Sequence, residues 1–241
     1  MALSDTFSFT LTRDGLIKRT LLLLGVISAD QTVAATEYTN AGEVLNLMLK
    51  AWQADGMQLW QVTGKSITPV KGQATYTIGP AGGVVVTGKP VALLEAYRRN
   101  TAEVSDIALI RQSRTQYWEL NDKDMEGTPT QYYWDIQQGV GANDLLVWPT
   151  PDQDFVDNNT IEILYQAPFD DMTISTSNLA FPQEWELAVV YGLAVILAPE
   201  YGLPLSSRQL LRSEAKEEKQ RVLDWDQEQT SIFFQPATRF R

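Results

Sequence analysis

The sequence predicts an α+β protein: a discontinuous antiparallel helical bundle, an inserted all-β domain of sandwich-like form, and an extended C-terminal tail. Three observations lead to this prediction. An amphipathic helix ends abruptly near Gly56, about a hundred residues with strand periodicity follow, and helical periodicity returns near Pro182. The expected domains are residues 1–57 together with 168–230 (a helical domain that forms a ring), residues 58–167, and residues 231–241.

The N-terminal part should contain an arm and a first helix. Residues 1–11 show no clear period and are expected to be extended. A helix is predicted over residues 13–27 with Thr12 as its N-cap, although Gly15 stands where a capping box would have Glu or Gln. Its apolar face would consist of Leu16, Thr20, Leu23, Leu24 and Ile27.

A polar linker, residues 28–36, should lead to a second helix over residues 35–55. Apolar residues recur there at gaps of three and four, which places them on one stripe: Tyr38, Ala41, Leu45, Met48 and Trp52. Asp55-Gly56 is a typical helix stop because glycine adopts the left-handed conformation without steric cost. The two helices are expected to form an antiparallel hairpin.

The middle of the chain has the β-branched and aromatic content of strands, separated by Gly, Pro and Asn. A short helix is also predicted over residues 112–120. The expected strands cover residues 60–70, 73–78, 91–99, 107–110, 130–136, 144–148 and 160–165.

The last third predicts two helices. Pro182 suits the first helical position, and the apolar helix that follows should end near Pro199. The second, residues 205–229, is highly charged with a thin apolar stripe. It reads either as a surface helix with i,i+4 ion pairs or as a helix that packs along neighbouring subunits. In the second case the inter-subunit residues would be Arg212, Lys216, Lys219 and Trp225. Trp52 and Trp185 are expected in one folded unit.

Composition argues against catalysis. The chain has neither histidine nor cysteine, so the commonest general base and the thiolate ligands of metals are missing. The formal charge is -11, and thirteen carboxylates but no basic residue lie between Lys123 and Arg208. This favours either an ordinary acidic surface or a surface that repels a polyanion, such as the wall of a conduit for DNA.

Two apolar segments resemble targeting or membrane sequences. Residues 18–29 imitate a signal peptide, but a polar segment precedes their basic pair. Residues 187–199 are uncharged, yet a membrane span needs about 20 residues. Both are interpreted as buried core helices, so we expect no membrane association and a protein that is cytosolic when made.

Several motifs imitate binding sites. Gly83–Pro90 approaches a P-loop, but proline replaces the hydroxyl residue that would hold magnesium. Asp122–Glu126 begins like an EF-hand loop, whose twelfth position is Tyr133 instead of Glu. Residues 152–157 could gather around calcium or form an acidic turn. No cofactor or metal is expected.

The final residues carry large apolar groups and two arginines in an acidic protein. Tails that order on a partner use such anchors, so residues 231–241 predict a docking tail or a strip that folds back on its own domain.

Three segments together resemble the head-to-tail adaptors of tailed bacteriophages: Leu45–Trp60, Phe181–Leu205 and Ser231–Pro236. They are similar to tail accessory factors, or packaged-DNA-stabilisation proteins, and to tubular protein A of short-tailed phages. Gly127–Asp135 and Leu145–Asp152 fit the β insertion of that group.

The resemblance implies a ring, expected to have twelve copies, that lies under the portal in the virion after assembly in the host cytoplasm. Packaged double-stranded DNA would pass through it without specific binding, and a tail nozzle or other tail protein would attach below. The C-terminal segment would dock on the portal protein through Phe233, Phe234, Gln235, Pro236, Arg239 and Phe240.

Two other functions stay open at this point. Abundant carboxylates and six aromatic residues of the middle segment could indicate a carbohydrate-binding or glycan-cleaving tail component: Trp60, Trp118, Tyr132, Tyr133, Trp134 and Trp148. Aromatic residues of a small β core explain the same pattern. A DNA-gripping closure protein is the third possibility.

Overall fold

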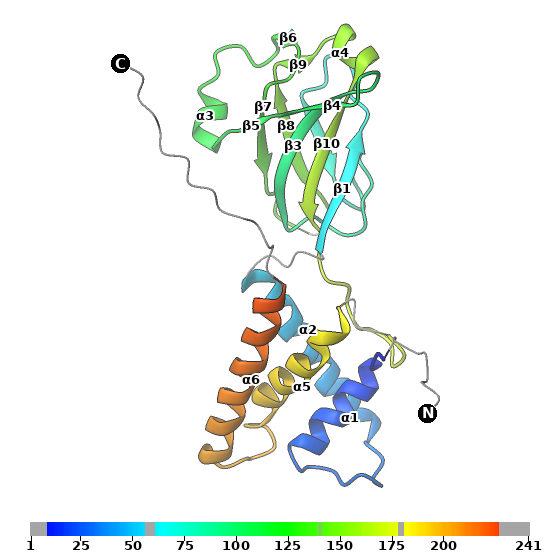
Figure 1. The fold of residues 1–241 in the computed structure, drawn as a ribbon, viewed down its shortest axis with the longest axis vertical. Helices are drawn as coiled ribbons and strands as arrows, with labels where there is room; N and C mark the ends of the chain where they lie inside the picture. The colour runs from blue at the N-terminus through cyan, green and yellow to red at the C-terminus, as the bar shows by residue number, and fades with distance from the viewer. Residues whose placement is uncertain (1–8, 56–60, 140, 178–180, 227–241) are drawn as a thin grey trace, which may run out of the picture. The chain divides into compact units, whose positions relative to one another are not determined.

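The chain divides into two compact units in a computed structural model that describes residues 9–55, 61–139, 141–177 and 181–226. The helical unit combines Met1–Leu59 with Asp170–Arg241, and the β unit is Trp60–Phe169. The fold is mixed α+β, as predicted: the long helices belong to the first unit and both four-stranded sheets to the second (Figure 1).

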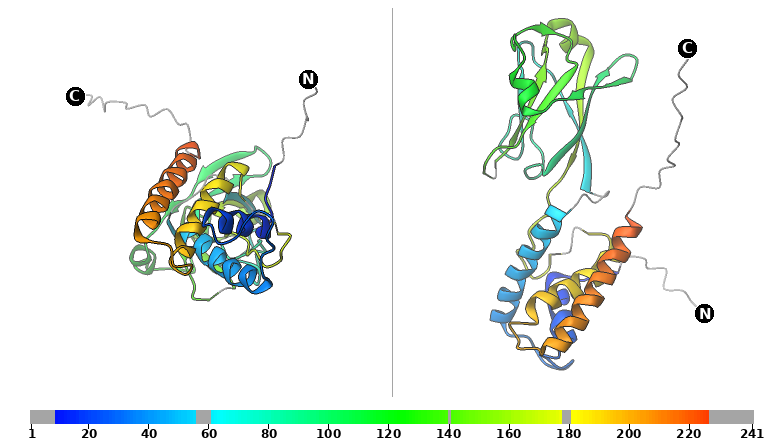
Figure 2. Two further views of the ribbon diagram at one scale, coloured as in Figure 1. Left: turned by 90° about the horizontal axis from the view of Figure 1, so that it is seen from below. Right: turned by 90° about the vertical axis from the view of Figure 1, so that its left-hand side faces the viewer.

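The helical unit is organised around one apolar helix. Its elements are α1 (Arg13–Leu23), α2 (Ala35–Asp55), the 3-10 turn η2 (Gln183–Trp185), α5 (Glu186–Leu197) and α6 (Leu205–Trp225). Helix α5 contacts α1, α2 and α6, and Figure 2 shows it between α6 and α1. It is apolar on nearly every side, and a helix of that kind is stable only when neighbours cover it.

Helix α1 is shorter than predicted. Thr12 caps it, since its Oγ1 accepts a hydrogen bond from the Gly15 amide at 3.2 Å. The helix ends at Leu23 rather than Ile27 because Gly25 has a φ of 70°. Its buried face was also partly misassigned: Leu23 is 38% exposed, and the buried helical residues are Leu16, Ile17, Thr20 and Leu21. Consecutive leucines carry no period that could choose between these faces.

Helix α2 has the predicted bounds, Ala35–Asp55. Ala41, Leu45 and Met48 of the predicted stripe are buried, together with Leu49. In the last third, Pro182 precedes η2 and is not the first residue of the α-helix. Helix α6 begins at Leu205 as expected and is described to Trp225, while residues 227–229 of its predicted range lie outside the described residues.

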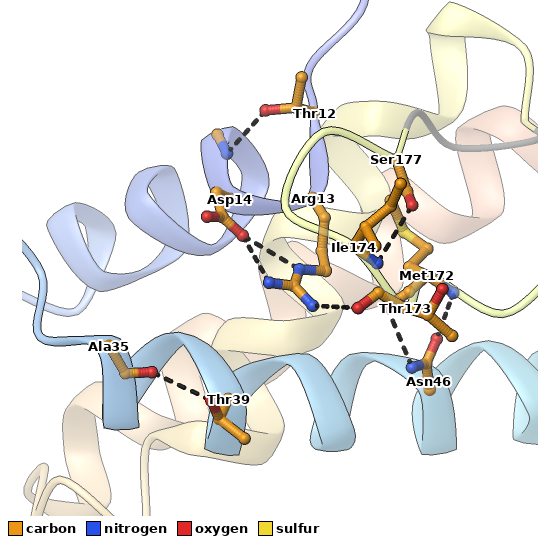
Figure 3. Close-up of polar contacts among 11 residues, drawn as sticks. Thr12, Arg13, Asp14, Ala35, Thr39, Asn46, Met172, Thr173, Ile174 and Ser177 are labelled. Atoms are coloured by element: carbon orange, nitrogen blue, oxygen red, sulfur yellow. Dashed lines mark hydrogen bonds and ion pairs between the residues drawn. The ribbon is translucent and has the colours of Figure 1, made fainter.

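A hydrogen-bonded clamp ties the returning chain to α1 and α2 (Figure 3). The Arg13 guanidinium donates to the Thr173 carbonyl at 3.0 Å and pairs with Asp14. Asn46 of α2 accepts from the Met172 amide at 2.9 Å and donates to the Met172 carbonyl at 3.4 Å. Segments more than a hundred positions apart in the chain are thereby fixed in one unit.

The β unit contains two four-stranded sheets with the orders β1-β10-β3-β4 and β2-β8-β7-β5. All their pairings are antiparallel except β5 with β7, and β6 and β9 form a small parallel pair. The strands are β1 (Val62–Ile67), β2 (Thr75–Ile78), β3 (Ala92–Asn100), β4 (Ser105–Ala108), β5 (Ile110–Arg111), β6 (Glu126–Gly127), β7 (Gln131–Asp135), β8 (Asn143–Trp148), β9 (Thr150–Pro151) and β10 (Asn159–Gln166).

One hydrophobic core serves both sheets. Buried side chains of β3 and β10, such as Leu93 and Ile163, belong to the same cluster as Tyr76 of β2 and Leu145 of β8. The alternation that predicted the strands is visible in β8, where every second residue is buried.

Two short helices complete the β unit. Helix α3 (Arg114–Trp118) falls within the predicted range and has a full capping box between Ser113 and Gln116. Helix α4 (Gln153–Asn158) was not predicted: the acidic residues at 152–157 had suggested a turn or a calcium loop. Asp152 caps it by accepting a hydrogen bond from the Phe155 amide at 2.8 Å.

Candidate assembly surfaces

A cluster of tilted aromatic rings, together with Lys219 of α6, joins α2, η2 and α6. The rings of Trp52 and Trp185 lie 6.2 Å apart, and Phe181 lies 5.8 Å from Trp185. The ammonium of Lys219 stands 4.8 Å from the centre of the Trp52 ring and 2.7 Å from an Asp55 carboxylate oxygen. The expectation that Trp52 and Trp185 share one folded unit is therefore confirmed.

The exposed surface of α6, outside its buried residues Leu211 and Val222, is the strongest candidate for contact with another protein. Arg212 and Lys216 are exposed there, and in the described part of the chain neither has an ion pair. Leu205, which lines one pocket with Arg212, is 63% exposed. Leu210 and Trp225, on other sides of the helix, are also at least 58% exposed. Apolar groups beside arginine are characteristic of protein interfaces. We call the exposed surface of α6 that carries these five residues the α6 face.

Of the four predicted inter-subunit residues, Arg212, Lys216 and Trp225 lie on the α6 face. Lys219 is placed differently, because its ammonium is engaged by Asp55 and Trp52 of its own chain. Sequence reasoning missed Leu205 and Leu210. Leu210 is followed by the buried Leu211, and the sparse apolar pattern of α6 did not show that the first of the pair faces outward.

The first turns of α6 also border a small pocket of about 140 Å³. Arg208 and Arg212 line it together with Pro199 and Leu205. The Nε of Arg208 is buried without a hydrogen-bond partner in the described structure. This end of α6 therefore presents cationic donors that an acidic group could engage.

The outer side of α2 offers a second exposed apolar group. Leu47 is 72% exposed, one turn beyond the exposed Glu43. Lys50, near it, pairs with Asp171 of the same unit at 2.9 Å. The six predicted portal-contact residues, Phe233, Phe234, Gln235, Pro236, Arg239 and Phe240, lie outside the described residues.

Comparison with known families decides the identity of the chain. The family described as SU10 adaptor protein matches residues 12–233, a range that contains nearly all of both units. The chain belongs to the SU10 adaptor protein family. Its resemblance to phage head-to-tail adaptors is thereby confirmed. A search of curated proteins found no match.

The polar cluster of this SU10 adaptor's β unit is structural. Arg114 of α3 donates to the Tyr133 hydroxyl at 3.0 Å and to an Asp135 carboxylate oxygen at 2.9 Å. Tyr133 and Gln137 donate to the same carboxylate. Burial alone would raise the pKa of Asp135, but the hydrogen bonds from Arg114 and Tyr133 outweigh it and lower that pKa. The cluster anchors α3 to β7.

The P-loop-like segment of the adaptor, residues 83–90, is occupied by its own chain. Lys89 donates its ammonium protons to the carbonyls of Gln137 and Gly139. An amine held by backbone carbonyls is not free to bind phosphate. This supports the interpretation of the segment as a glycine-rich loop.

The acidic motifs also have structural roles. Asp122 accepts a hydrogen bond from the Asp124 amide, and Asp152 caps α4. Across residues 9–55, 61–139, 141–177 and 181–226, no three acidic side chains are placed to hold a metal ion.

Among the described residues of the β unit, the aromatic side chains do not form a common open face. Tyr132, Tyr133 and Trp134 are buried, while Trp118 is 62% exposed with Lys123 over its ring. Burial raises the pKa of Tyr132, so this phenol stays neutral near pH 7 and is a poor general base. A sugar-stacking surface is therefore not favoured, and core packing accounts for the pattern.

No helix in the described part of the adaptor is both long enough and apolar enough to cross a membrane. The apolar segment 187–199 corresponds to α5 at the centre of the helical unit, as interpreted from its length.

Proposed function

We propose that this protein is the structural head-to-tail connector of a tailed phage. It forms a ring under the portal, extends the DNA channel, retains the packaged genome and provides the platform for tail attachment. The match to the SU10 adaptor family across both units carries this proposal. The family is one of structural adaptors, which implies interaction with other phage head or tail proteins and a role without catalysis.

In this proposal the helical unit is a bundle that builds the ring wall, and the β unit is a sandwich-like insertion that faces outward or towards the tail. Burial of α5 among α1, α2 and α6 supports a stiff wall element. The α6 face supplies Arg212, Lys216 and Trp225 to the neighbouring subunit. We expect twelve copies in the ring.

Charge reversal tests the ring surface. Arg212→Glu with Lys216→Glu changes the formal charge by four units on the α6 face, and should abolish ring formation in sedimentation velocity with purified portal present. Lys65→Glu with Lys71→Glu is the matched control, since both lysines are exposed on the β unit. Equal loss of ring formation in both variants would show a general charge effect. Rings formed by the Arg212→Glu, Lys216→Glu variant would show that the α6 face is not the contact between subunits.

The C-terminal segment docks on the portal through Phe233, Phe234, Gln235, Pro236, Arg239 and Phe240. Aromatic and arginine side chains dominate binding energy at interfaces, and this segment contains both. Phe233→Ala with Phe234→Ala in the full chain should weaken co-sedimentation with portal rings by at least about tenfold, since two anchors each contribute more than about 1 kcal/mol. Trp118→Ala, an exposed aromatic residue of the β unit, is the control. Unchanged co-sedimentation of the double variant contradicts the docking role.

DNA passes through the ring without specific binding. The long stretch without a basic residue, from 124 to 207, supports this because gripping a polyanion requires Lys and Arg. The isolated protein should not retain double-stranded DNA at physiological salt. Retention that weakens steeply with added salt would favour a DNA-gripping closure protein instead.

We place the mature protein at the head–tail junction of the virion, between the portal and a tail nozzle or other tail protein. Assembly takes place in the host cytoplasm, and no step involves a membrane.

A further inference from the structure

An apolar hollow of about 510 Å³ opens on the helical unit between residues 9–11, α1 and the start of α5. Its apolar walls come from Phe9, Leu11, Leu187 and Val190, and Arg19 and Glu186 are its charged lining residues. We call it the Leu187 hollow. It is separate from the α6 face, and nothing in the proposed ring contacts uses it.

Leu11, one wall of the hollow, is held in place before any ligand arrives. Glu186 is only 6% exposed, and its Oε1 accepts a hydrogen bond from the Leu11 amide at 2.8 Å. Two residues further on, the Arg13 amide donates to the Ser177 carbonyl at 2.8 Å. Leu11 is thus fixed against α5, and a fixed wall lowers the entropic cost of binding.

The rim of the hollow leaves apolar area in water. Phe9 is 70% exposed and Leu187 is 49% exposed, whereas Val190 at the base is 3% exposed. Covering two large side chains of this kind is favourable in proportion to the apolar area removed from water. An aromatic ring is the occupant that would gain most, because it buries a large rigid surface.

We propose that the Leu187 hollow holds Phe233 and Phe234 of the same chain in the free subunit. The position of the chain end supports this occupant. The contacts of Lys219 with Trp52 and of Trp52 with Trp185 bring the C-terminal half of α6 near η2, which directly precedes Glu186 and Leu187. Phe233 follows Asp226 by seven residues, and an extended chain of that length spans up to about 25 Å. A tethered segment also has a high effective concentration at a nearby site.

Charge complementarity points the same way. Residues 229–241 contain no acidic side chain and carry Arg239 and Arg241, in a protein whose formal charge is -11. The segment before α5 presents the opposite sign, with Glu184 exposed in η2, while the charged residues that line the hollow, Arg19 and Glu186, balance each other. The hollow therefore shields two phenylalanines that would otherwise promote aggregation of the free subunit. The proposal concerns binding of the two phenylalanines in the hollow of the free subunit, and it does not depend on whether the tail docks on the portal.

Disulfide trapping tests the proposal in the full chain. The sequence has no cysteine, so within one chain two introduced cysteines can pair only with each other. Leu187→Cys with Phe234→Cys should form an intrachain disulfide under mild oxidation at least tenfold faster than Leu210→Cys with Phe234→Cys. Leu210 is the control because it is 60% exposed on α6, outside the hollow. Intact mass and non-reducing electrophoresis separate intrachain from interchain products, and circular dichroism checks that each variant folds.

A second measurement needs no disulfide. Alkylation of Leu187→Cys should be about tenfold faster when Phe233→Ala and Phe234→Ala are also present, because the occupant is lost. Equal alkylation rates, or equal trapping of the 187 and 210 pairs, overturn the proposal. Interchain disulfides would overturn the proposal in favour of the tail of a neighbouring subunit. A disulfide between Leu187→Cys and Phe7→Cys that forms faster than the one between Leu187→Cys and Phe234→Cys would overturn it in favour of the N-terminal arm. Both assays are done without portal, so loss of portal binding cannot be mistaken for failure here.

Discussion

Gly192 allows α2 and α5 to approach more closely than any other residue would permit, and Gly192→Ala tests how much this contact matters. An added Cβ would lie 2.6 Å from Cζ2 of Trp52 and 3.0 Å from Sδ of Met48. Alanine is favoured over glycine in a helix by about 1 kcal/mol, while overpacking a fixed contact costs about 1–3 kcal/mol. Trp52 cannot easily withdraw, because Trp185 and Lys219 hold it. We expect a net destabilisation of up to about 2 kcal/mol.

The same substitution at Gly42 is the matched control. Gly42 lies in α2, and a Cβ there would meet the Arg13 side chain at 3.7 Å, an ordinary contact distance. Gly42→Ala should therefore stabilise the helical unit by up to about 1 kcal/mol. Urea unfolding followed by circular dichroism at 222 nm reports mainly on the helical unit, since most helical residues belong to it. A Gly192→Ala variant as stable as Gly42→Ala would refute the close-packing argument.

Two further variants test electrostatic contacts. Lys219→Met keeps the aliphatic stem but removes the charge near Trp52 and Asp55. The free energy of unfolding of the helical unit should fall by about 1 kcal/mol, and by less at high salt, which screens the ion pair. Unchanged stability of the free subunit would return Lys219 to the inter-subunit surface. Asp135 has a lowered pKa in the folded state, so its contribution is present above its unfolded pKa and is lost as pH falls through the lower folded value. Asp135→Asn should accordingly be less stable than the natural protein at pH 7, and the difference should shrink on acidification below about pH 4, where the unfolded carboxyl begins to protonate; a pH-independent difference in the thermal midpoint would contradict this.

Periodicity located most elements of the fold because most faces of the molecule are either clearly buried or clearly exposed. Helix α2 was predicted to its end residues, since its apolar stripe is bounded by a linker and a glycine. The errors occur where sequence is locally ambiguous. The leucine run of α1 carries no period, and its buried face depends on how α5 packs against it. Helix α4 is one and a half turns long, too short for a hydrophobic pattern, and only its Asp152 cap could have indicated it.

The candidate surfaces were less predictable than the fold. Sequence placed Arg212 and Lys216 on a charged helix, but whether a lysine pairs within its chain depends on which helix lies opposite. Lys219 illustrates this, since Asp55 and Trp52 are more than 160 positions away in the chain. The outward-facing Leu210 was missed for the same reason. Tertiary contacts, not local pattern, decide which side chains stay available to another subunit.

The long insertion adds little loop-closure entropy to the folding of the helical unit. Strands β1 and β10 pair antiparallel, with Val62 opposite Gln166, so the folded β unit holds its own two ends side by side. The helical unit likewise holds its two ends close. Lys50 pairs with Asp171 at 2.9 Å, and only five residues of α2 follow Lys50. Each unit thus holds close together the two chain ends that lead into the other unit. The entropic cost of loop closure also grows only slowly with loop length, so it adds little to the cost of folding.

This arrangement predicts that the β unit is dispensable for folding of the helical unit. Replacing residues 61–169 by about six glycine and serine residues should span the gap, because each residue of such a linker adds up to about 3.3 Å. The shortened protein should keep the helical signal at 222 nm. Its free energy of unfolding, obtained from urea titration, should stay within about 1 kcal/mol of the value for the helical transition of the full chain. Introducing Gly192→Ala into it should cost the same as in the full chain, since Trp52 and Met48 lie in the retained unit. Loss of cooperative helical unfolding in the shortened protein would mean that the packing of α5 requires the insertion, and that the two units are not independent.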